Sequence, residues 1–107
     1  MERTLNVGCG NDFECTDRID MHKTSATTKV CDLNKKFPFK DNTFSYIKAR
    51  SVLEHIKNLS NFVDECHRVL KPGGKIYIRT DFAGFLLAHI WKKHEPNRAL
   101  QVQYKAG

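Results

Sequence analysis

Short apolar segments recur along the chain, and a polar residue ends most of them. These segments are too short for helices, so we expect them to be strands. The five predicted strands span Thr4 to Val7, Arg18 to Asp20, Lys29 to Leu33, Phe44 to Ala49 and Lys75 to Thr80. Each of the first two connections holds about ten residues or fewer, close to the minimum for a parallel crossover, which favours loops there over full helices.

A helical period of apolar residues lies between the fourth and fifth of these segments. Its members are Leu59, Phe62, Val63, Cys66 and Val69 or Leu70. We expect a helix from Ser60, its N-cap, to Leu70. Within it, Asp64 can reach Arg68 one turn later. The turn Pro72-Gly73-Gly74 ends the helix and leads into the fifth strand.

Another apolar stretch predicts a last helix from Phe82 or Ala83 to His94, whose broad apolar surface needs a partner. Beyond it, apolar and polar residues alternate over Ala99 to Tyr104, and this segment can fold back as an added strand. The alternative is a homodimer joined through the edge of strand 75–80 and the last helix. An unpaired strand edge invites pairing with another chain.

The first strand runs into two glycines one residue apart, Gly8 and Gly10. Glycine accepts the positive φ of a tight turn and leaves room for a ligand beside the backbone. An ordinary tight turn after a buried strand has the same pattern. However, Asp20 and Asp32 end the second and third apolar segments. Because open α/β sheets bind ligands at the carboxyl ends of their strands, this order favours a ligand site.

Four sequence motifs follow one another in a characteristic order. They are Val7-Gly8-Cys9-Gly10, Asp20, Phe37-Pro38-Phe39-Lys40-Asp41-Asn42-Thr43-Phe44 with Val52-Leu53-Glu54-His55, and Arg68-Val69-Leu70-Lys71-Pro72-Gly73-Gly74-Lys75. Together they cover residues 5 to 80 and resemble the class I S-adenosylmethionine-dependent methyltransferases, specifically the type 11-like group. The resemblance implies an α/β fold with a Rossmann-like, doubly wound, mainly parallel sheet of strand order 3-2-1-4-5. We expect residues 1–107 to form a single, minimal domain that lacks part of the usual C-terminal strands.

The resemblance also implies S-adenosylmethionine as the cofactor and methyl transfer to an acceptor that the motifs do not identify. The expected cofactor-binding residues are Asn6, Gly8, Cys9, Gly10, Asp20, Asp32, Leu33 and Ser51. The Asp20 carboxylate is expected to accept hydrogen bonds from both ribose hydroxyls, and the alternative is that it caps its own turn. Asp32 is expected to face the adenine amino group, with the backbone of Leu33 facing the ring. Asp32 can instead start a turn.

Arg50, Glu54 and His55 are the candidate catalytic residues, because they follow the fourth strand where the reactive methyl group should lie. Methyl transfer from a sulfonium is an in-line displacement that needs alignment and, for some acceptors, a base. His55 can be that base, since histidine ordinarily titrates near neutrality. The competing interpretation is that Glu54 and His55 cap and brace a short helix.

Two positions depart from the family pattern. Asn6 stands where members usually carry an acidic residue, and Asp12 stands where they carry a third glycine. Asn6 supplies no charge to offset the cofactor's ammonium group. These departures and the short C-terminus keep open a second hypothesis, a non-catalytic methyltransferase-like module that binds cofactor or a partner.

Composition and charge narrow the remaining choices. The chain has 40% hydrophobic and 28% charged residues, with no apolar run of the roughly 20 residues that a membrane helix needs. The absence of a signal peptide predicts a cytoplasmic location. The net charge of +6 admits a nucleic-acid partner, but a solvated basic face is favoured because no aromatic residues interleave with a long basic run. The four cysteines lack the close pairing of a zinc site, so we expect no metal.

Overall fold

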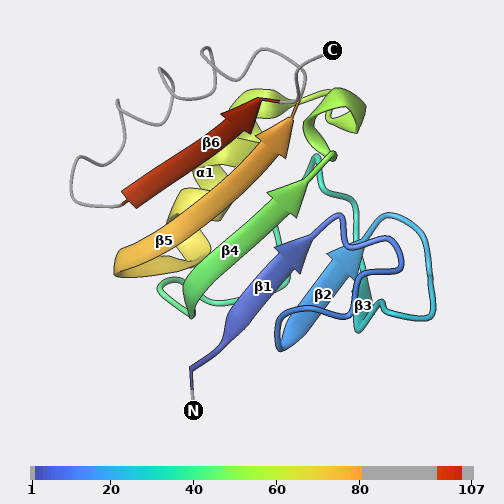
Figure 1. The fold of residues 1–107 in the computed structure, drawn as a ribbon, viewed down its shortest axis with the longest axis horizontal. Helices are drawn as coiled ribbons and strands as arrows, with labels where there is room; N and C mark the ends of the chain where they lie inside the picture. The colour runs from blue at the N-terminus through green and yellow to red at the C-terminus, as the bar shows by residue number, and fades with distance from the viewer. Residues whose placement is uncertain (1, 81–98, 105–107) are drawn as a thin grey trace.

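The computed structural model describes residues 2–80 and 99–104. Six parallel strands form one sheet in the order β3-β2-β1-β4-β5-β6 (Figure 1). Their bounds are β1 Thr4–Val7, β2 Asp17–Asp20, β3 Lys29–Val30, β4 Phe44–Arg50, β5 Leu70–Thr80 and β6 Ala99–Tyr104. The predicted order of the first five strands, 3-2-1-4-5, is confirmed. A short 3-10 helix, η1 (Leu53–His55), and the α-helix α1 (Leu59–Val69) lie between β4 and β5 along the chain.

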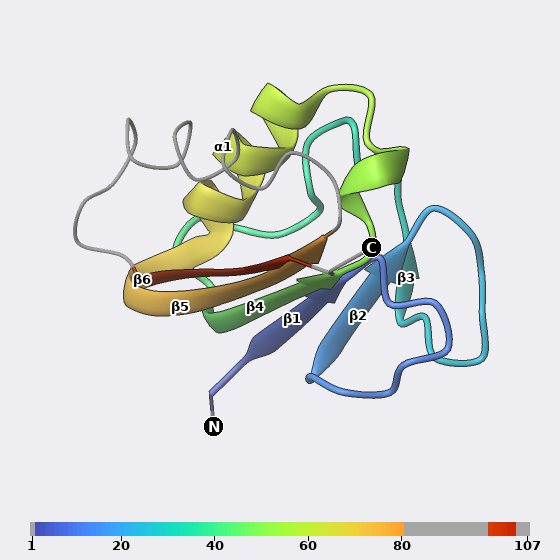
Figure 2. The same ribbon diagram turned by 45° about the horizontal axis from the view of Figure 1, so that its top comes forward.

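One face of the sheet packs against α1 and forms the core (Figure 2). Leu5 of β1 stands beside Ile47 of β4, which stands beside Ile76 of β5, and all three are fully buried. From α1, the buried residues Phe62, Val63, Cys66 and Val69 complete this core. Fully burying an apolar side chain of this size contributes about 1.5–3 kcal/mol, so this layer holds the sheet together.

The start of α1 differs from the prediction by one or two residues. Asn58, not Ser60, is the N-cap, because the Asn58 side chain accepts a hydrogen bond from the Asn61 amide at 3.1 Å. That bond satisfies one of the free N–H groups of the first turn. The helix ends at Val69, one residue before the predicted Leu70, which is already extended.

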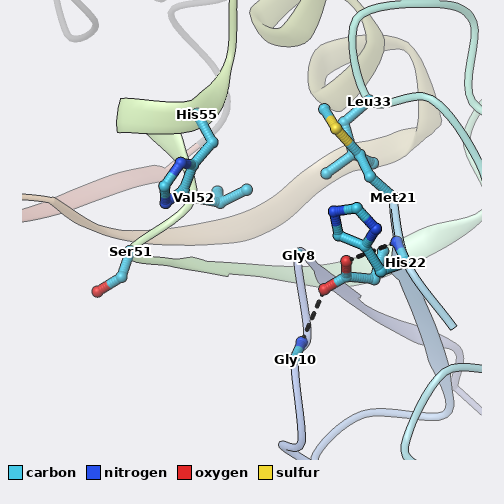
Figure 3. A pocket seen from close by; sticks show the side chains of 9 residues that line it. Gly8, Gly10, Met21, His22, Leu33, Ser51, Val52 and His55 are labelled. Carbon is cyan, nitrogen blue, oxygen red and sulfur yellow. Dashed lines mark hydrogen bonds between the residues drawn. The ribbon is translucent and has the colours of Figure 1, made fainter. Parts of the chain in front are cut away.

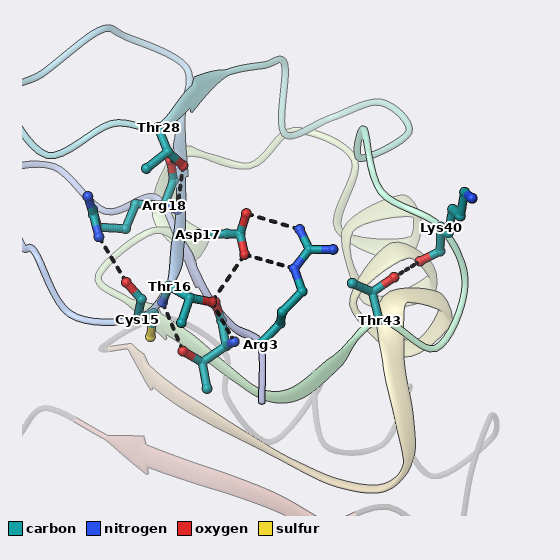
Figure 4. Close-up of polar contacts among 9 residues, drawn as sticks. Arg3, Cys15, Thr16, Asp17, Arg18, Thr28, Lys40 and Thr43 are labelled. Carbon is teal, nitrogen blue, oxygen red and sulfur yellow. Dashed lines mark hydrogen bonds and ion pairs between the residues drawn. The ribbon is translucent and has the colours of Figure 1, made fainter. Parts of the chain in front are cut away.

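The connections 8–16 and 21–28 contain no helix, as predicted from their length. Side-chain hydrogen bonds organise them instead (Figure 4). Arg3 pairs with Asp17 at 3.1 Å, and the Arg18 guanidinium donates to the backbone carbonyls of Cys15 and Ala26 at 2.9 and 2.6 Å. These contacts fix both loops relative to β2.

β2 and β4 are each one residue longer than predicted, and β3 and β5 differ more. β3 ends at Val30, not at Leu33, because Asp32 and Asn34 form a turn in which the Asn34 amide donates to the Asp32 carboxylate at 2.9 Å. β5 begins at Leu70, not at Lys75. The register passes from Phe44 beside Leu70 to Tyr46 beside Lys75, so the Lys-Pro-Gly-Gly segment forms a bulge within the strand.

The outer edge of β5 is paired with β6, residue for residue from Lys75 beside Ala99 to Thr80 beside Tyr104. This is the folded-back strand that the alternation over residues 99–104 predicted. In this structure β6 occupies the edge that the predicted homodimer would use, and the homodimer itself remains a prediction. The predicted last helix lies outside the described residues. Within the described ranges, no helix is long and apolar enough to cross a membrane.

Candidate functional site

A pocket of about 300 Å³ lies where β1, β2 and β4 end at the carboxyl edge of the sheet. We call it the main pocket. Ser51, Val52 and His55 lie on one side of it, Met21, His22 and Leu33 lie on the other, and Gly8 and Gly10 lie between them (Figure 3). Asp20 completes the lining. The structure thus brings together residues from four segments that are far apart in the sequence.

Gly8 and Gly10 both have left-handed backbone conformations, but the space around them differs. Their φ angles are +71° and +54°, in the region that favours glycine. A Cβ at Gly8 would clash with the Val52 side chain, so Gly8 allows β1 to approach the segment after β4. A Cβ at Gly10 would meet no atom within 4 Å. Since Gly10 lines the main pocket, the space beside it is open to a ligand.

The Asp20 carboxylate holds the turns on both sides of it. One oxygen accepts a hydrogen bond from the Gly10 amide at 2.9 Å, and the other accepts one from the His22 amide at 3.0 Å (Figure 3). The bond to His22 is the turn cap that the sequence left as the alternative. Each carboxylate oxygen has a second acceptor site. Asp20 can therefore cap its turn and still accept hydrogen bonds from a ligand in the main pocket.

Asp32 and Leu33 lie in different surroundings although they are neighbours. The Leu33 side chain is buried and lines the main pocket. The Asp32 side chain is exposed and does not line it. Its hydrogen bond from the Asn34 backbone, followed by that from the Asn34 side chain, lowers the pKa of Asp32 despite slight desolvation. The structure therefore shows Asp32 in the turn that the sequence kept as its second interpretation.

The segment after β4 turns sharply into the main pocket. Ser51 has a φ of +54°, and its amide donates to the Arg79 carbonyl of β5 at 2.8 Å. This turn places Val52 and His55 in the pocket lining. Glu54, on the same 3-10 helix as His55, is exposed and lines neither this pocket nor its neighbour.

Asn6, Cys9 and Arg50 lie in a second pocket, which adjoins the first. This charged pocket has a volume of about 500 Å³ and shares Gly8, Gly10 and Ser51 with the main pocket. Its other lining residues are Asn6, Cys9, Asn11, Asp12, Glu14, Lys48 and Arg50. Except for Asp32 and Glu54, which line neither pocket, the predicted site residues thus form two groups that meet at the glycine turn.

Several lining residues carried no prediction. Met21 and His22 directly follow Asp20, and their position after the second strand is a signal that could have identified them. Sequence patterns offered little reason to expect Lys48 in a pocket, because a single lysine within an apolar strand usually points to solvent. In the structure it is buried, at 7% exposure, and contacts two acidic residues more than thirty positions away.

This combination of residues suits a ligand with a nucleoside part. Leu33, Met21 and Val52 offer apolar surface to a flat ring, and Asp20 offers acceptors to hydroxyl groups. His55 is the one imidazole on the β4 side of the main pocket as lined by the described residues. Among all the residues that the structure describes, no group of three or more His, Cys, Asp or Glu side chains could hold a metal ion.

Comparison with protein families matches residues 14–78, more than half of the chain, to a methyltransferase domain. The matched range includes Asp20, Ser51 and His55 but begins after the glycine turn. No solved structure matches the chain.

Curated relatives share shorter segments with this chain. The mitochondrial ubiquinone biosynthesis O-methyltransferase of Rattus norvegicus is 38% identical over 52 residues, which are 49% of this chain and 15% of the rat protein. Phosphoethanolamine N-methyltransferase 3 of Arabidopsis thaliana is 30% identical over 105 residues, covering 76% of this chain and 21% of the plant protein. The ubiquinone/menaquinone biosynthesis C-methyltransferase UbiE of Desulfotalea psychrophila is 45% identical over 47 residues, which are 44% of this chain and 19% of the bacterial protein. The chain thus spans about a fifth or less of each relative.

Proposed function

The chain belongs to the methyltransferase domain family, and we propose that it binds S-adenosylmethionine in the main pocket and transfers the cofactor's methyl group to an acceptor. The observation that carries this proposal is the Asp20 carboxylate, held at the end of β2 between the Gly10 turn and His22. The three relatives are named as O-, N- and C-methyltransferases, so the proposal names no acceptor atom.

The residues of the main pocket fit the nucleoside part of this cofactor. Asp20 has acceptor sites left for the ribose hydroxyls, and hydrogen bonds to a carboxylate are stronger than neutral ones. The open space beside Gly10 leaves room for the sugar, since a side chain there would enter it. Leu33 and Met21 supply apolar contacts for the adenine ring. Asp32 remains a predicted adenine contact whose carboxylate, in this structure, caps the Asn34 turn.

The bound cofactor supplies an electrophilic methyl group on a positively charged sulfur. The protein then has to align the acceptor, exclude water and, for an acidic acceptor group, remove a proton. His55 lines the main pocket and is our proposed base. Arg50 lines the charged pocket and can orient an anionic acceptor or cofactor group. Glu54 is exposed outside both pockets, which favours its bracing role in η1 over direct catalysis.

A second candidate function is a module that binds the cofactor without transferring its methyl group. The observation that favours it is Asn6, which is neutral and buried where an acidic residue is usual in the family. We propose a single domain in either case, since the six strands form one sheet. A cytoplasmic location likewise remains a prediction.

The test of cofactor binding is isothermal titration calorimetry with S-adenosylhomocysteine, comparing the wild type with Asp20→Ala. We expect the variant to bind roughly tenfold or more weakly, because it loses charge-assisted hydrogen bonds that contribute about 1.5–3 kcal/mol. Asp17→Ala is the matched control, since Asp17 lies at the opposite end of the same strand and pairs with Arg3. Thermal unfolding of each variant reports whether it is folded. Unchanged affinity in folded Asp20→Ala would contradict the role of Asp20, and no binding by the wild type at millimolar ligand would contradict the function.

The test of catalysis compares His55→Ala with the wild type. The assay follows methyl transfer from S-adenosylmethionine to a panel of hydroxyl, amine and carbon nucleophiles. We expect turnover to fall while the affinity for S-adenosylhomocysteine stays nearly unchanged, because His55 acts on the acceptor and not on the cofactor. An equal loss of cofactor affinity or of thermal stability would instead support the bracing role. A wild type that binds cofactor but methylates none of the panel would favour the non-catalytic module.

A further inference from the structure

The charged pocket continues the main pocket on the far side of the glycine turn. The two share Gly8, Gly10 and Ser51, so a ligand that fills the main pocket can extend past the turn into the charged one. Their chemistry differs. The main pocket offers apolar side chains around one carboxylate, whereas the charged pocket is lined by both acidic and basic side chains. A long ligand with a nucleoside at one end and both charges at the other would match this pair of pockets.

Three charged side chains in this pocket form one cluster. The Lys48 ammonium group lies 2.7 Å from the Asp12 carboxylate and 2.8 Å from that of Glu14. The Lys48 side chain is only 8% exposed, whereas those of Asp12 and Glu14 are 32% and 69% exposed. Lysine therefore anchors the cluster from the sheet, and the two carboxylates present their remaining acceptor sites to the pocket.

Two members of the cluster, Asp12 and Lys48, are stabilised in their charged forms. The hydrogen bond from Lys48, and then that from the Glu14 amide, lowers the pKa of Asp12 although burial opposes it. Burial opposes the charge of Lys48, but hydrogen bonds to Asp12 and Glu14 outweigh it and raise the pKa of Lys48. One ammonium group is thus shared by two carboxylates. The uncompensated negative charge is the kind of site that attracts a ligand ammonium group.

Asn6 explains why the negative charge lies on the loop. Its side chain is 1% exposed, and its amide nitrogen donates to the Glu14 carbonyl at 3.4 Å. Asn6 is also the smallest of the influences that lower the pKa of Asp12. A carboxylate at position 6 would face these same acceptors without a proton to donate. The amide at position 6 and the acid at position 12 are therefore complementary.

We propose that Asp12 and Glu14, anchored by Lys48, bind the ammonium group at the amino-acid end of S-adenosylmethionine, and that Arg50 binds the carboxylate of that end. This inference rests on the proposed function, because it needs the nucleoside in the main pocket. It assigns to the loop after β1 the negative charge that Asn6 does not supply. The two departures from the family pattern then compensate each other.

The experiment compares two ligands by calorimetry. S-adenosylhomocysteine has both ends, and methylthioadenosine has the nucleoside without the amino-acid end. We expect Asp12→Asn to weaken S-adenosylhomocysteine binding about tenfold and methylthioadenosine binding less than about twofold, since only the first ligand carries the ammonium group. Glu14→Gln should do the same to a smaller extent, and its exposed side chain makes it the variant least able to unfold the protein. Asp41→Asn, an exposed acid beside Arg68, is the control for net charge.

The outcomes separate this inference from the function on which it rests. Equal losses for both ligands, or no loss for either, would overturn the inference and leave the cofactor assignment intact. A wild type that binds both ligands with the same affinity would also overturn it. Absence of binding to either ligand would overturn the function as well.

Discussion

The two halves of the sheet are stabilised by different forces. The half with β4 and β5 is covered by α1, whose apolar residues pack on the sheet. The half with β1, β2 and β3 has loops in place of crossover helices, and polar side chains hold these loops through short hydrogen bonds (Figure 4). The main pocket lies where the two halves meet, with Val52 from one and Asp20 from the other.

This difference explains where binding residues can be placed. A hydrophobic layer tolerates few polar groups, because a buried polar atom without a partner destabilises the fold. The loops at residues 8–16 and 21–28 already use polar side chains as structural contacts. The same groups can therefore serve a ligand, as Asp20 does when it caps a turn with acceptor sites still available.

The comparison predicts the largest loss of stability for a substitution in the half of the sheet that α1 covers. Phe62 in α1 is fully buried, whereas Phe13 in the loop after β1 is 59% exposed. We expect Phe62→Ala to lower the free energy of unfolding by about 3–5 kcal/mol, since it leaves a cavity in the core. Phe13→Ala should lower it by about 0.5 kcal/mol, mostly through the lost contact with the Arg18 guanidinium. Urea denaturation measures both, and similar values would show that the apolar core is not concentrated under α1.

An intermediate effect should follow removal of the Glu65 carboxylate. Glu65 accepts hydrogen bonds from the Phe37 amide at 2.6 Å and from Arg68 at 2.8 and 2.9 Å. We expect Glu65→Gln to lower the free energy of unfolding at pH 7 by about 2–3 kcal/mol, because Arg68 and the Phe37 amide lose a charged partner. Asp41→Asn is the matched control. Asp41 also pairs with Arg68, but its side chain is 72% exposed against 11% for Glu65, so we expect less than about 0.5 kcal/mol.

The contact between Glu65 and Arg68 also predicts how stability depends on pH. Burial opposes the charge of Glu65, but the hydrogen bonds from Arg68 and Phe37 outweigh it and lower its pKa below the ordinary 4.5. A carboxylate with a lowered pKa contributes stability above its unfolded pKa and loses it as the pH falls through its folded pKa. The difference in stability between wild type and Glu65→Gln should therefore be largest above pH 4.5 and shrink below it. A difference that grows on acidification would contradict this account.

In the polar half, removal of the Thr24 hydroxyl should change stability less than removal of the Glu65 carboxylate does, and the change should be coupled to binding. The Thr24 hydroxyl donates to the Gly10 carbonyl and lies 2.7 Å from the Thr27 hydroxyl, so it joins the loop after β2 to the glycine turn. We expect Thr24→Val to lower the free energy of unfolding by about 1 kcal/mol. It should also weaken S-adenosylhomocysteine binding severalfold, because Gly10 lines both pockets.

Thr43→Val provides the matched control for Thr24→Val. Its hydroxyl donates to the Lys40 carbonyl at 2.7 Å, outside both pockets. We expect a similar change in stability without a change in affinity. If both variants lowered the affinity equally, the polar loops would not be specifically coupled to the site.

Local signals in the amino-acid order determined much of this protein. Short apolar segments predicted β1 and most of β4, and the 3.6-residue period predicted α1 to within one or two residues. The short first and second connections predicted loops. Gly8, Gly10 and Asp20 were identified because glycine or aspartate at the end of a short apolar segment is a local signal of a turn. The motif order predicted the family that the domain match supports.

Only the tertiary structure decided how distant segments combine. It showed Leu33 in the pocket and Asp32 in a turn, although the two are adjacent, because the β3 connection reaches the main pocket with one side chain and leaves the other exposed. It brought Lys48 of β4 to Asp12 and Glu14 in the loop after β1. Of the two arrangements that the sequence left open for the edge of β5, it shows the pairing with β6. Strand pairing and ion pairs between remote residues depend on register and burial, which local sequence patterns do not encode. For this reason the sequence did not predict that Lys48, Asp12 and Glu14 meet in the charged pocket.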